Sequence, residues 1–257
     1  MSLLRDLKVL YSLALAPVKG KTHAERMEGF YGRQADQYDD FRKRLLKGRA
    51  ELYQAIEAPE QGIWIDFGGG TGSNLEFLGD RIHRLKHVYL VDLAESLLKV
   101  AERRAEDRGW HNFEAVYADA TTYRPEASPL VDVVTFSYSL TMIPNWFAAI
   151  DHAYRILKPG GVIGVVDFYV SRKSPDEGLR RHPWSTRSFW RSWFDFDHVF
   201  PNPDHLPYLH HRFEAQNLDE CRAKVPYLPL VRAPYYVFVG RKPLDNQANQ
   251  APPPVQV

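Results

Sequence analysis

The sequence contains almost no cysteine and no long apolar run, and each of these absences excludes a class of protein. The single cysteine, Cys221, cannot form an internal disulfide bond, and a chain without disulfides suits a reducing compartment. Nothing in the sequence around Cys221 marks it as an activated nucleophile, so we interpret it as a small apolar filler. No stretch of the sequence reaches the ~18 unbroken apolar residues that a membrane-spanning helix requires.

The sequence also lacks a large net charge of either sign. Its 33 Lys and Arg residues are balanced by 32 Asp and Glu residues, which leaves a formal net charge of +1. No global field therefore favours nucleic acid or another polyanion as a partner. Aromatic residues, by contrast, make up 13% of the chain. A length of 257 residues allows one sizeable α/β domain with a well-buried core, and we expect a cytoplasmic protein.

The chain is organised around a glycine-rich stretch, residues 62–72, which reads Gly-Ile-Trp-Ile-Asp-Phe-Gly-Gly-Gly-Thr-Gly. Ile63–Phe67 is an apolar run with one acid in it, which is typical of a buried strand. The glycines allow backbone N–H groups to approach a ligand closely, and a helical pattern begins at Ser73. Strand, glycine loop and helix in this order predict a nucleotide site at the carboxyl edge of a parallel sheet. The dinucleotide fingerprint fits poorly, because Ser73 occupies the place of its third small residue.

Further apolar runs predict more strands, two of which end at an acid suited to ligand binding. The runs are His87–Val91, Phe113–Tyr117 and Leu130–Phe136. Asp92 follows the first run, 20 residues after Gly72. An acid at that place either accepts hydrogen bonds from a ribose or caps the next helix. Asp119 follows the second run in a turn.

The C-terminal half predicts one more parallel strand and a closing pair. A helix that begins at Trp146 is expected to stop at Leu-Lys-Pro-Gly-Gly, residues 157–161, where the glycines form a turn. Val162–Val166 then reads as a fifth strand, with Asp167 at its carboxyl edge. Residues 213–217 and 235–241 read as the last two strands of the sheet.

Between the fifth strand and this pair lies an aromatic, basic and proline-rich insertion at about residues 170–211. Its aromatic residues can either wall a pocket for an apolar chain or a quaternary ammonium, or form the core of a lid of two helices. They are Trp184, Phe189, Trp190, Trp193 and Phe194. The prolines at 201, 203 and 207 predict an irregular loop. The histidines at 205, 210 and 211 lack the spacing of metal ligands, so we predict no metal site.

The two ends of the chain lie outside this domain, which we place at residues 25–243. Residues 2–16, within an N-terminal segment 1–24, have the apolar spacing of an amphipathic helix with nearby basic residues. Three interpretations stay open for it: a helix docked on the domain, a helix in contact with a membrane surface, or a cleaved signal peptide. Residues 244–257 are rich in proline and glutamine and read as a disordered tail.

The order of these motifs resembles class I S-adenosylmethionine (SAM) methyltransferases. The resemblance rests on Asp66-Phe-Gly-Gly-Gly-Thr-Gly72, Asp92, Asp119-Ala120 and Lys158-Pro-Gly-Gly161. It implies an α/β, Rossmann-like fold: a seven-stranded, mostly parallel sheet with helices on both faces and a lid-like insertion before the last two strands. It also implies SAM as cofactor and S-adenosyl-L-homocysteine as product. A nicotinamide oxidoreductase and a non-catalytic SAM-binding protein are the alternatives.

The same resemblance implies which residues bind SAM. The expected residues are Tyr38, Asp66, Gly68, Gly69, Gly70, Thr71, Asp92, Leu93, Asp119, Ala120 and Ser137. Asp92 would accept hydrogen bonds from the ribose, and Asp119 from the adenine amino group. Tyr31 and Tyr38 would either cover the sulfonium, because an aromatic face attracts a cation, or pack with their segment on the edge of the sheet.

Four segments resemble a narrower group, the betaine-lipid enzymes that transfer methyl groups from SAM to diacylglycerylhomoserine. These are residues 30–39, 66–72, 136–146 and 210–213. The resemblance implies threefold methylation of the homoserine amine to give diacylglyceryl-trimethylhomoserine. It also implies a separate enzyme that supplies the lipid, and a peripheral position at the inner face of the membrane. A C-methyltransferase of a quinone ring or another small apolar acceptor is the alternative.

The acceptor amine must be neutral to attack the methyl group, so a proton acceptor or a dry aromatic pocket should lie beside it. Tyr138, Asp167 and His182 are the catalytic candidates for that environment. Tyr31, Trp184 and Arg212 are the candidates for binding the substrate.

Overall fold

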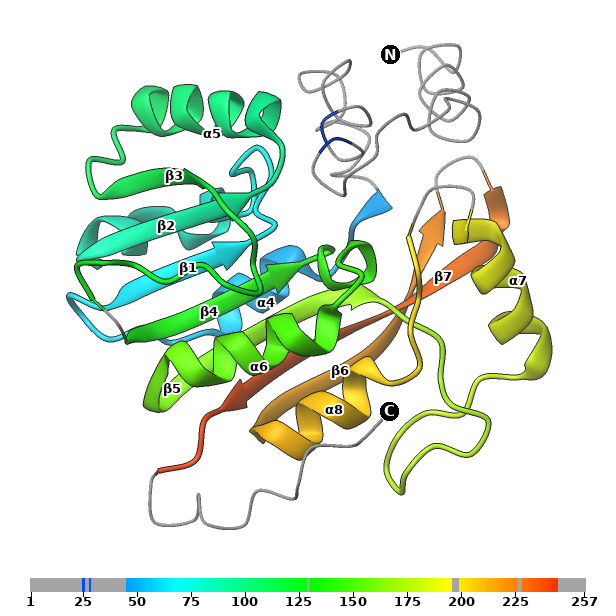
Figure 1. Cartoon of the computed structure of the whole chain (residues 1–257). Helices are drawn as coiled ribbons and strands as arrows, with labels where there is room; N and C mark the ends of the chain where they lie inside the picture. The colour runs from blue at the N-terminus through cyan, green and yellow to red at the C-terminus, as the bar shows by residue number, and fades with distance from the viewer. Residues whose placement is uncertain are drawn as a thin grey trace.

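A seven-stranded sheet forms the centre of the computed structural model, which describes Glu25, Glu28 and residues 45–128, 130–195, 199–225 and 228–244 (Figure 1). The strand order is β3-β2-β1-β4-β5-β7-β6. The strands are β1 Ile63–Phe67, β2 His87–Asp92, β3 Phe113–Tyr117, β4 Val131–Ser137, β5 Leu157–Phe168, β6 Glu214–Val225 and β7 Leu228–Arg241. The first five pair in parallel, and β7 runs antiparallel to both β5 and β6. The predicted fold class is confirmed.

Helices cover both faces of the sheet. One face carries α4 (Arg49–Ala55), η1 (Leu75–Arg84) and α5 (Glu95–Arg108), and the other carries α6 (Trp146–Ile156) and α8 (His205–Arg212). Successive strand residues alternate between these two cores: Trp64 packs into the first and Ile65 into the second. Two shorter elements complete the set, η2 (Leu140–Met142) after β4 and α7 (Trp184–Asp195) within the insertion.

The segment after the glycine loop differs from the predicted helix. It is a 3₁₀ helix, and Gly79 interrupts it with φ of 55° and ψ of −139°. A residue in this conformation cannot continue a helical hydrogen-bond ladder. The apolar spacing of Leu75, Leu78 and Ile82 still buries these side chains, as the sequence pattern requires.

Three predictions about the C-terminal half were wrong in their boundaries. Residues 158–161 belong to β5 instead of forming a turn, because Gly161 and Gly160 exchange backbone hydrogen bonds with Lys242. Part of the predicted loop at 195–211 is helix α8, and Pro207 is tolerated there because the first turn of a helix needs no N–H donor. The last two strands are longer than predicted, so that Pro234 lies inside β7, where its carbonyl accepts a hydrogen bond from the N–H of Tyr169.

Two predicted regions, residues 2–16 and the tail from residue 245 on, lie outside the described residues. Among the helices that the structure describes, none is long and apolar enough to span a bilayer.

Candidate functional site

A cavity opens at the carboxyl ends of β1, β2 and β4, at the point where the chain order of the strands reverses. Its volume is about 880 Å³, including the open space at its mouth. Gly68 and Gly70 form its floor, and Asp92 and Leu93 follow from β2. Residues 118–121 close one side, and six residues between 138 and 145 close the other. Open parallel sheets bind their ligands at this kind of switch point.

The glycine loop fits closely against its surroundings. Gly68 and Gly70 have φ of 66° and 58°, values that favour glycine. A Cβ atom on Gly68 would lie 2.4 Å from Cβ of Ser139, and one on Gly69 would lie 2.7 Å from Cγ of Leu90. A side chain at position 68 would therefore collide with the cavity wall, and one at position 69 would collide with the core beneath the loop. Gly69 and Thr71, which were also predicted to bind SAM, lie outside the cavity lining. The geometry fits the predicted SAM site.

Asp92 connects the glycine loop to the end of β2. Its Oδ2 accepts a hydrogen bond from the N–H of Gly70 at 2.9 Å, and its Oδ1 accepts one from the N–H of Ala94 at 3.0 Å. No side chain caps helix α5, whose N-cap is Ala94, so the capping interpretation of Asp92 is wrong. Asp92 lies in the cavity wall, where a carboxylate can accept hydrogen bonds from ribose hydroxyls.

Asp119 and Ala120 line the same cavity, after the neighbouring strand β3. Oδ1 of Asp119 accepts hydrogen bonds from both the N–H and the hydroxyl of Thr121, each at 2.7 Å. These bonds hold the turn in shape, while the carboxylate itself is exposed. The turn can therefore present an acceptor to an adenine amino group.

Asp66 lies beneath the glycine loop and outside the cavity lining. Its Oδ1 accepts hydrogen bonds from the hydroxyls of Tyr53 at 2.7 Å and Thr135 at 2.8 Å. Burial raises the pKa of this carboxyl to about 6, although the two hydroxyls lower it. Its Oδ2 would lie 2.9 Å from a Cβ atom on Gly69. Asp66 therefore supports the loop from below.

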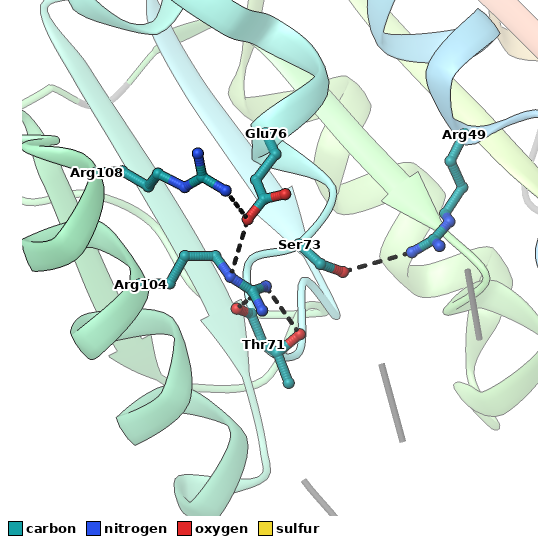
Figure 2. A network of polar contacts seen from close by, with 6 residues as sticks. All are labelled: Arg49, Thr71, Ser73, Glu76, Arg104 and Arg108. Atoms are coloured by element: carbon teal, nitrogen blue, oxygen red, sulfur yellow. Dashed lines mark hydrogen bonds and ion pairs between the residues drawn. The ribbon is translucent and has the colours of Figure 1, made fainter. Parts of the chain in front are cut away.

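A polar network holds the outer side of the loop (Figure 2). The guanidinium of Arg104, on α5, donates to the carbonyl of Thr71 at 2.7 Å and pairs with Glu76 at 3.3 Å. Arg108 contacts the same oxygen of Glu76 at 3.2 Å. From α4, Arg49 donates to Oδ1 of Asn74 at 3.0 Å. Two helices thus fix the loop from opposite sides.

Tyr138 lines the other end of the cavity. It adopts φ of 55°, which is strained for a residue with a side chain, and its N–H donates to the carbonyl of Val166 at 2.7 Å. Its hydroxyl donates to the carbonyl of Lys47 at 2.6 Å. Burial, and next the charge of Asp167, raise the pKa of this phenol well above its usual value.

Asp167 lies behind this wall and not in the cavity lining. Its carboxylate accepts hydrogen bonds from the hydroxyl of Thr141 at 2.7 Å, the N–H of Thr141 at 3.1 Å and the N–H of Phe168 at 2.8 Å. Burial raises its pKa to about 7, against the lowering effect of these hydrogen bonds. In this geometry Asp167 positions the wall segment and does not reach the cavity.

Three other predicted residues lie away from the cavity lining. His182 is buried against Tyr169, its Nδ1 accepts from the N–H of Ser171, and burial lowers its pKa to about 4. Arg212 pairs with Asp151 from helix α8. Trp184 begins helix α7, with 74% of its surface exposed. No group of metal ligands occurs among the described residues.

The acceptor side of the cavity contains lining residues that the sequence did not predict. Ser137 was predicted at the site, but its side chain is buried away from the cavity lining, and Ser139 lines the cavity instead. Met142 and Ile143 line it as well. All of them belong to the 136–146 segment, whose resemblance to known enzymes was the only available signal. Tyr31 and Tyr38 lie outside the described residues.

Comparison with known sequences identifies a matching family. The family described as "Methyltransferase domain" matches residues 31–220. A ubiquinone/menaquinone biosynthesis C-methyltransferase, UbiE, from Hydrogenovibrio crunogenus is 28% identical over 152 residues. That match covers 56% of this chain and 59% of the relative, so it spans less than two thirds of the relative's length.

Comparison with solved structures finds the same fold in N-methyltransferases. The N-methyltransferase NodS from Bradyrhizobium japonicum, solved with S-adenosylhomocysteine, superposes with a TM-score of 0.61 at 14% identity. The match covers 84% of this chain and 98% of NodS. A phosphoethanolamine N-methyltransferase from Haemonchus contortus, also solved with S-adenosylhomocysteine, gives a TM-score of 0.57 at 16% identity and covers 76% and 52% of the two chains. These likenesses show the fold.

Proposed function

We propose a methyl acceptor for this chain, which belongs to the methyltransferase domain family and is a SAM-dependent methyltransferase of class I fold. The acceptor is the homoserine amine of diacylglycerylhomoserine, which the enzyme methylates three times to give the betaine lipid. One observation carries the proposal. The 136–146 segment, which resembles the betaine-lipid enzymes most specifically, contributes six residues to the lining of the cavity.

The two ends of the cavity suit two different parts of the reaction. The end with Asp92 and Asp119 has carboxylates for the ribose and adenine of SAM. The sulfonium, when the cofactor is bound, supplies the methyl group by in-line displacement. Gly68, Gly70, Asp92 and Asp119 would hold the cofactor, which leaves the wall formed by Tyr138 and its neighbours for the acceptor. Alignment of the two reactants can lower the barrier of such a step by about 7–11 kcal/mol.

The chemistry of this wall suits a neutral amine. Ser139, Met142, Ile143 and Pro144 carry no charge, and Tyr138 is the only ionisable side chain among the described lining residues between 138 and 145. Transfer from water to such surroundings disfavours an ammonium ion and so lowers the pKa of the amine. The wall therefore promotes loss of a proton to solvent before attack. Tyr138 borders the reacting centre as an aromatic surface that tolerates the growing positive charge.

A second acceptor, the ring carbon of a quinol, follows from a different observation. The UbiE relative from Hydrogenovibrio crunogenus is a quinone C-methyltransferase. An uncharged, partly apolar wall also suits a quinol ring.

Direct competition between acceptors tests the proposal. The purified chain is incubated with SAM carrying a labelled methyl group and with diacylglycerylhomoserine or a demethylated quinol, each in the same detergent micelles. We expect label in the homoserine lipid, with mono-, di- and trimethylated products appearing in succession by mass spectrometry. Label confined to the quinol would overturn the lipid acceptor and support C-methylation.

An Asp92→Ala variant is the matched control, because it retains the acceptor wall but lacks the ribose acceptor. It should label neither substrate. Transfer at the wild-type rate by this variant would show that the label arrives by a route that does not use the cavity.

A further inference from the structure

Helix α7 exposes three large aromatic side chains to solvent. Trp184 is 74% exposed, Phe189 43% and Trp193 39%, and the rings of Phe189 and Trp193 stack with centroids 5.6 Å apart. The other side of the helix buries Trp190 and Phe194 against the domain. Exposed apolar residues are common singly, but a cluster of large rings on one helix indicates a surface that contacts another phase or molecule.

The segment that carries this helix is basic, unlike the chain as a whole. Residues 171–195 contain six Lys or Arg and three Asp or Glu, a net charge of +3, while the entire chain has +1. Arg181 and Arg191 are exposed, the first three residues before Trp184 and the second on α7 itself. Trp with Arg or Lys on one surface is the composition that the interface of an anionic bilayer selects, because the rings enter the head-group region and the cations meet its phosphates.

The exposed rings are connected to the cavity by a continuous series of packed aromatic residues. Tyr138, in the cavity wall, contacts Phe168 at a centroid distance of 4.7 Å, and Phe168 contacts Phe194 at 4.6 Å. Phe194 stacks on Trp190 at 5.2 Å, and Trp190 contacts Phe189 at 5.1 Å. The buried side of α7 is thus connected through Phe194 and Phe168 to Tyr138, on the acceptor side of the cavity. Helix α5, on the cofactor side, lies across the molecule from it (Figure 1).

We propose that Trp184, Phe189, Arg191 and Trp193 of α7, together with Arg181, form a docking face for an anionic lipid bilayer. Arg181 and Arg191 contact the lipid phosphates, and the three rings insert among the head groups. An acceptor lipid can then keep its acyl chains in the bilayer while its head group enters the cavity. This inference deepens the proposed function, since it gives a lipid acceptor its route to the site.

Vesicle co-sedimentation tests the docking face without any acceptor lipid. The full chain is pelleted with vesicles of phosphatidylcholine alone or mixed with phosphatidylglycerol. We expect binding to the mixed vesicles and about tenfold weaker partitioning for the pair Arg181→Ala/Arg191→Ala, since each cation contributes to attraction by an anionic surface. The pair Trp184→Ala/Trp193→Ala should also lose about tenfold, through lost insertion of apolar surface.

Matched controls remove similar groups elsewhere. Tyr117, on β3, is 52% exposed, and Arg84, at the end of η1, is exposed. Neither Tyr117→Ala nor Arg84→Ala should change partitioning. Equal thermal unfolding midpoints and equal SAM affinity would show that the α7 variants are folded.

Three outcomes would overturn the docking face. The first is that the wild-type chain fails to pellet with the mixed vesicles. The second is that both paired α7 variants pellet as the wild type does, while deletion of residues 1–20 abolishes pelleting. The third is that sedimentation equilibrium shows a dimer that the Trp184→Ala/Trp193→Ala pair converts to monomer, which would assign the face to a second copy of the chain. The vesicles contain no acceptor lipid. A failed lipid-methylation assay would therefore not change the result of the vesicle-binding test.

Discussion

The cofactor side and the acceptor side of the cavity each rest on a buried carboxyl group, but the two are held differently. Asp66 lies under the glycine loop and receives hydrogen bonds from Tyr53 of α4 and Thr135 of β4, both parts of the central core. Asp167 lies behind the acceptor wall and receives two of its hydrogen bonds from Thr141, a residue of the wall segment itself. The carboxyl under the cofactor side is thus held by core residues, while Asp167 binds a residue of the acceptor wall itself. The wall has two further bonds to the sheet, from the N–H of Tyr138 to the carbonyl of Val166 and from the hydroxyl of Ser139 to the carbonyl of Phe67.

Thr141 also connects the wall to the insertion. Its carbonyl accepts a hydrogen bond at 2.9 Å from the N–H of Phe200, which lies between α7 and α8. A change in the insertion can therefore reach the acceptor wall without disturbing the glycine loop.

The largest effect on SAM binding is expected from a change on the cofactor side, Asp92→Ala. The change removes the acceptor for the ribose together with the bond to Gly70. Two hydrogen bonds to a charged group, each contributing about 1.5–3 kcal/mol, predict at least about a hundredfold rise in the Kd for SAM. Isothermal titration calorimetry measures it. The control is Asp107→Ala, an exposed acid on α5, and unchanged affinity in Asp92→Ala would refute the ribose assignment.

A steric change beneath the loop should follow. In Gly69→Ala the new Cβ would lie 2.7 Å from Cγ of Leu90 and 2.9 Å from Oδ2 of Asp66. Overpacking of this kind typically costs about 1–3 kcal/mol of unfolding free energy, and here it should also weaken SAM binding. Urea unfolding and calorimetry measure both. In Gly109→Ala nothing lies within 4 Å of the new Cβ, although φ is 66°, so stability alone should fall. Normal SAM binding by Gly69→Ala would contradict the close fit of the loop.

Asp167 and Asp66 should make the free energy of unfolding depend on pH over different pH ranges. Burial raises the pKa of Asp167 to about 7, above the ordinary value for an unfolded chain, so the folded state holds this proton more tightly. The stabilisation it contributes is present at low pH and is lost as pH rises through about 7, with a slope of at most about 1.4 kcal/mol per pH unit. Asp167→Asn should remove that slope.

Asp66 gives the matched comparison, because burial raises its pKa to about 6. Asp66→Asn should remove the pH dependence of the unfolding free energy only below about pH 6. Urea unfolding of each variant between pH 5 and pH 8 measures the difference. If Asp167→Asn keeps the wild-type pH dependence between pH 6 and pH 7, the raised pKa of Asp167 is wrong.

The smallest effect is expected in the outer network of Figure 2. Arg104→Ala removes a charged hydrogen bond to the carbonyl of Thr71, and the resulting freedom of the loop should raise the Kd for SAM about three- to tenfold. Arg108 contacts Glu76 alone in this network, and its side chain is 58% exposed, so Arg108→Ala should change the Kd by less than about twofold. Equal effects of the two changes would show that the network does not position the loop.

The sequence by itself predicted the cofactor side well. Strands β1 and β3 have the predicted boundaries, and Asp92, Asp119, Gly68 and Gly70 line one cavity, although Gly69 does not. The physical reason is local. Apolar runs define buried strands, glycines define the loop, and an acid that directly follows a parallel strand lies at the ligand-binding edge of the sheet.

Only the tertiary structure decided the acceptor side. Asp167 reads as a candidate base in the sequence, yet the fold uses its carboxylate to hold Thr141. Trp184 reads as a pocket wall, yet α7 turns it outward. Such roles depend on which residues the chain brings together from distant positions, as in the series of rings from Tyr138 to Phe189. Packing of this kind depends on long-range contacts, which leave no short-range pattern in the sequence.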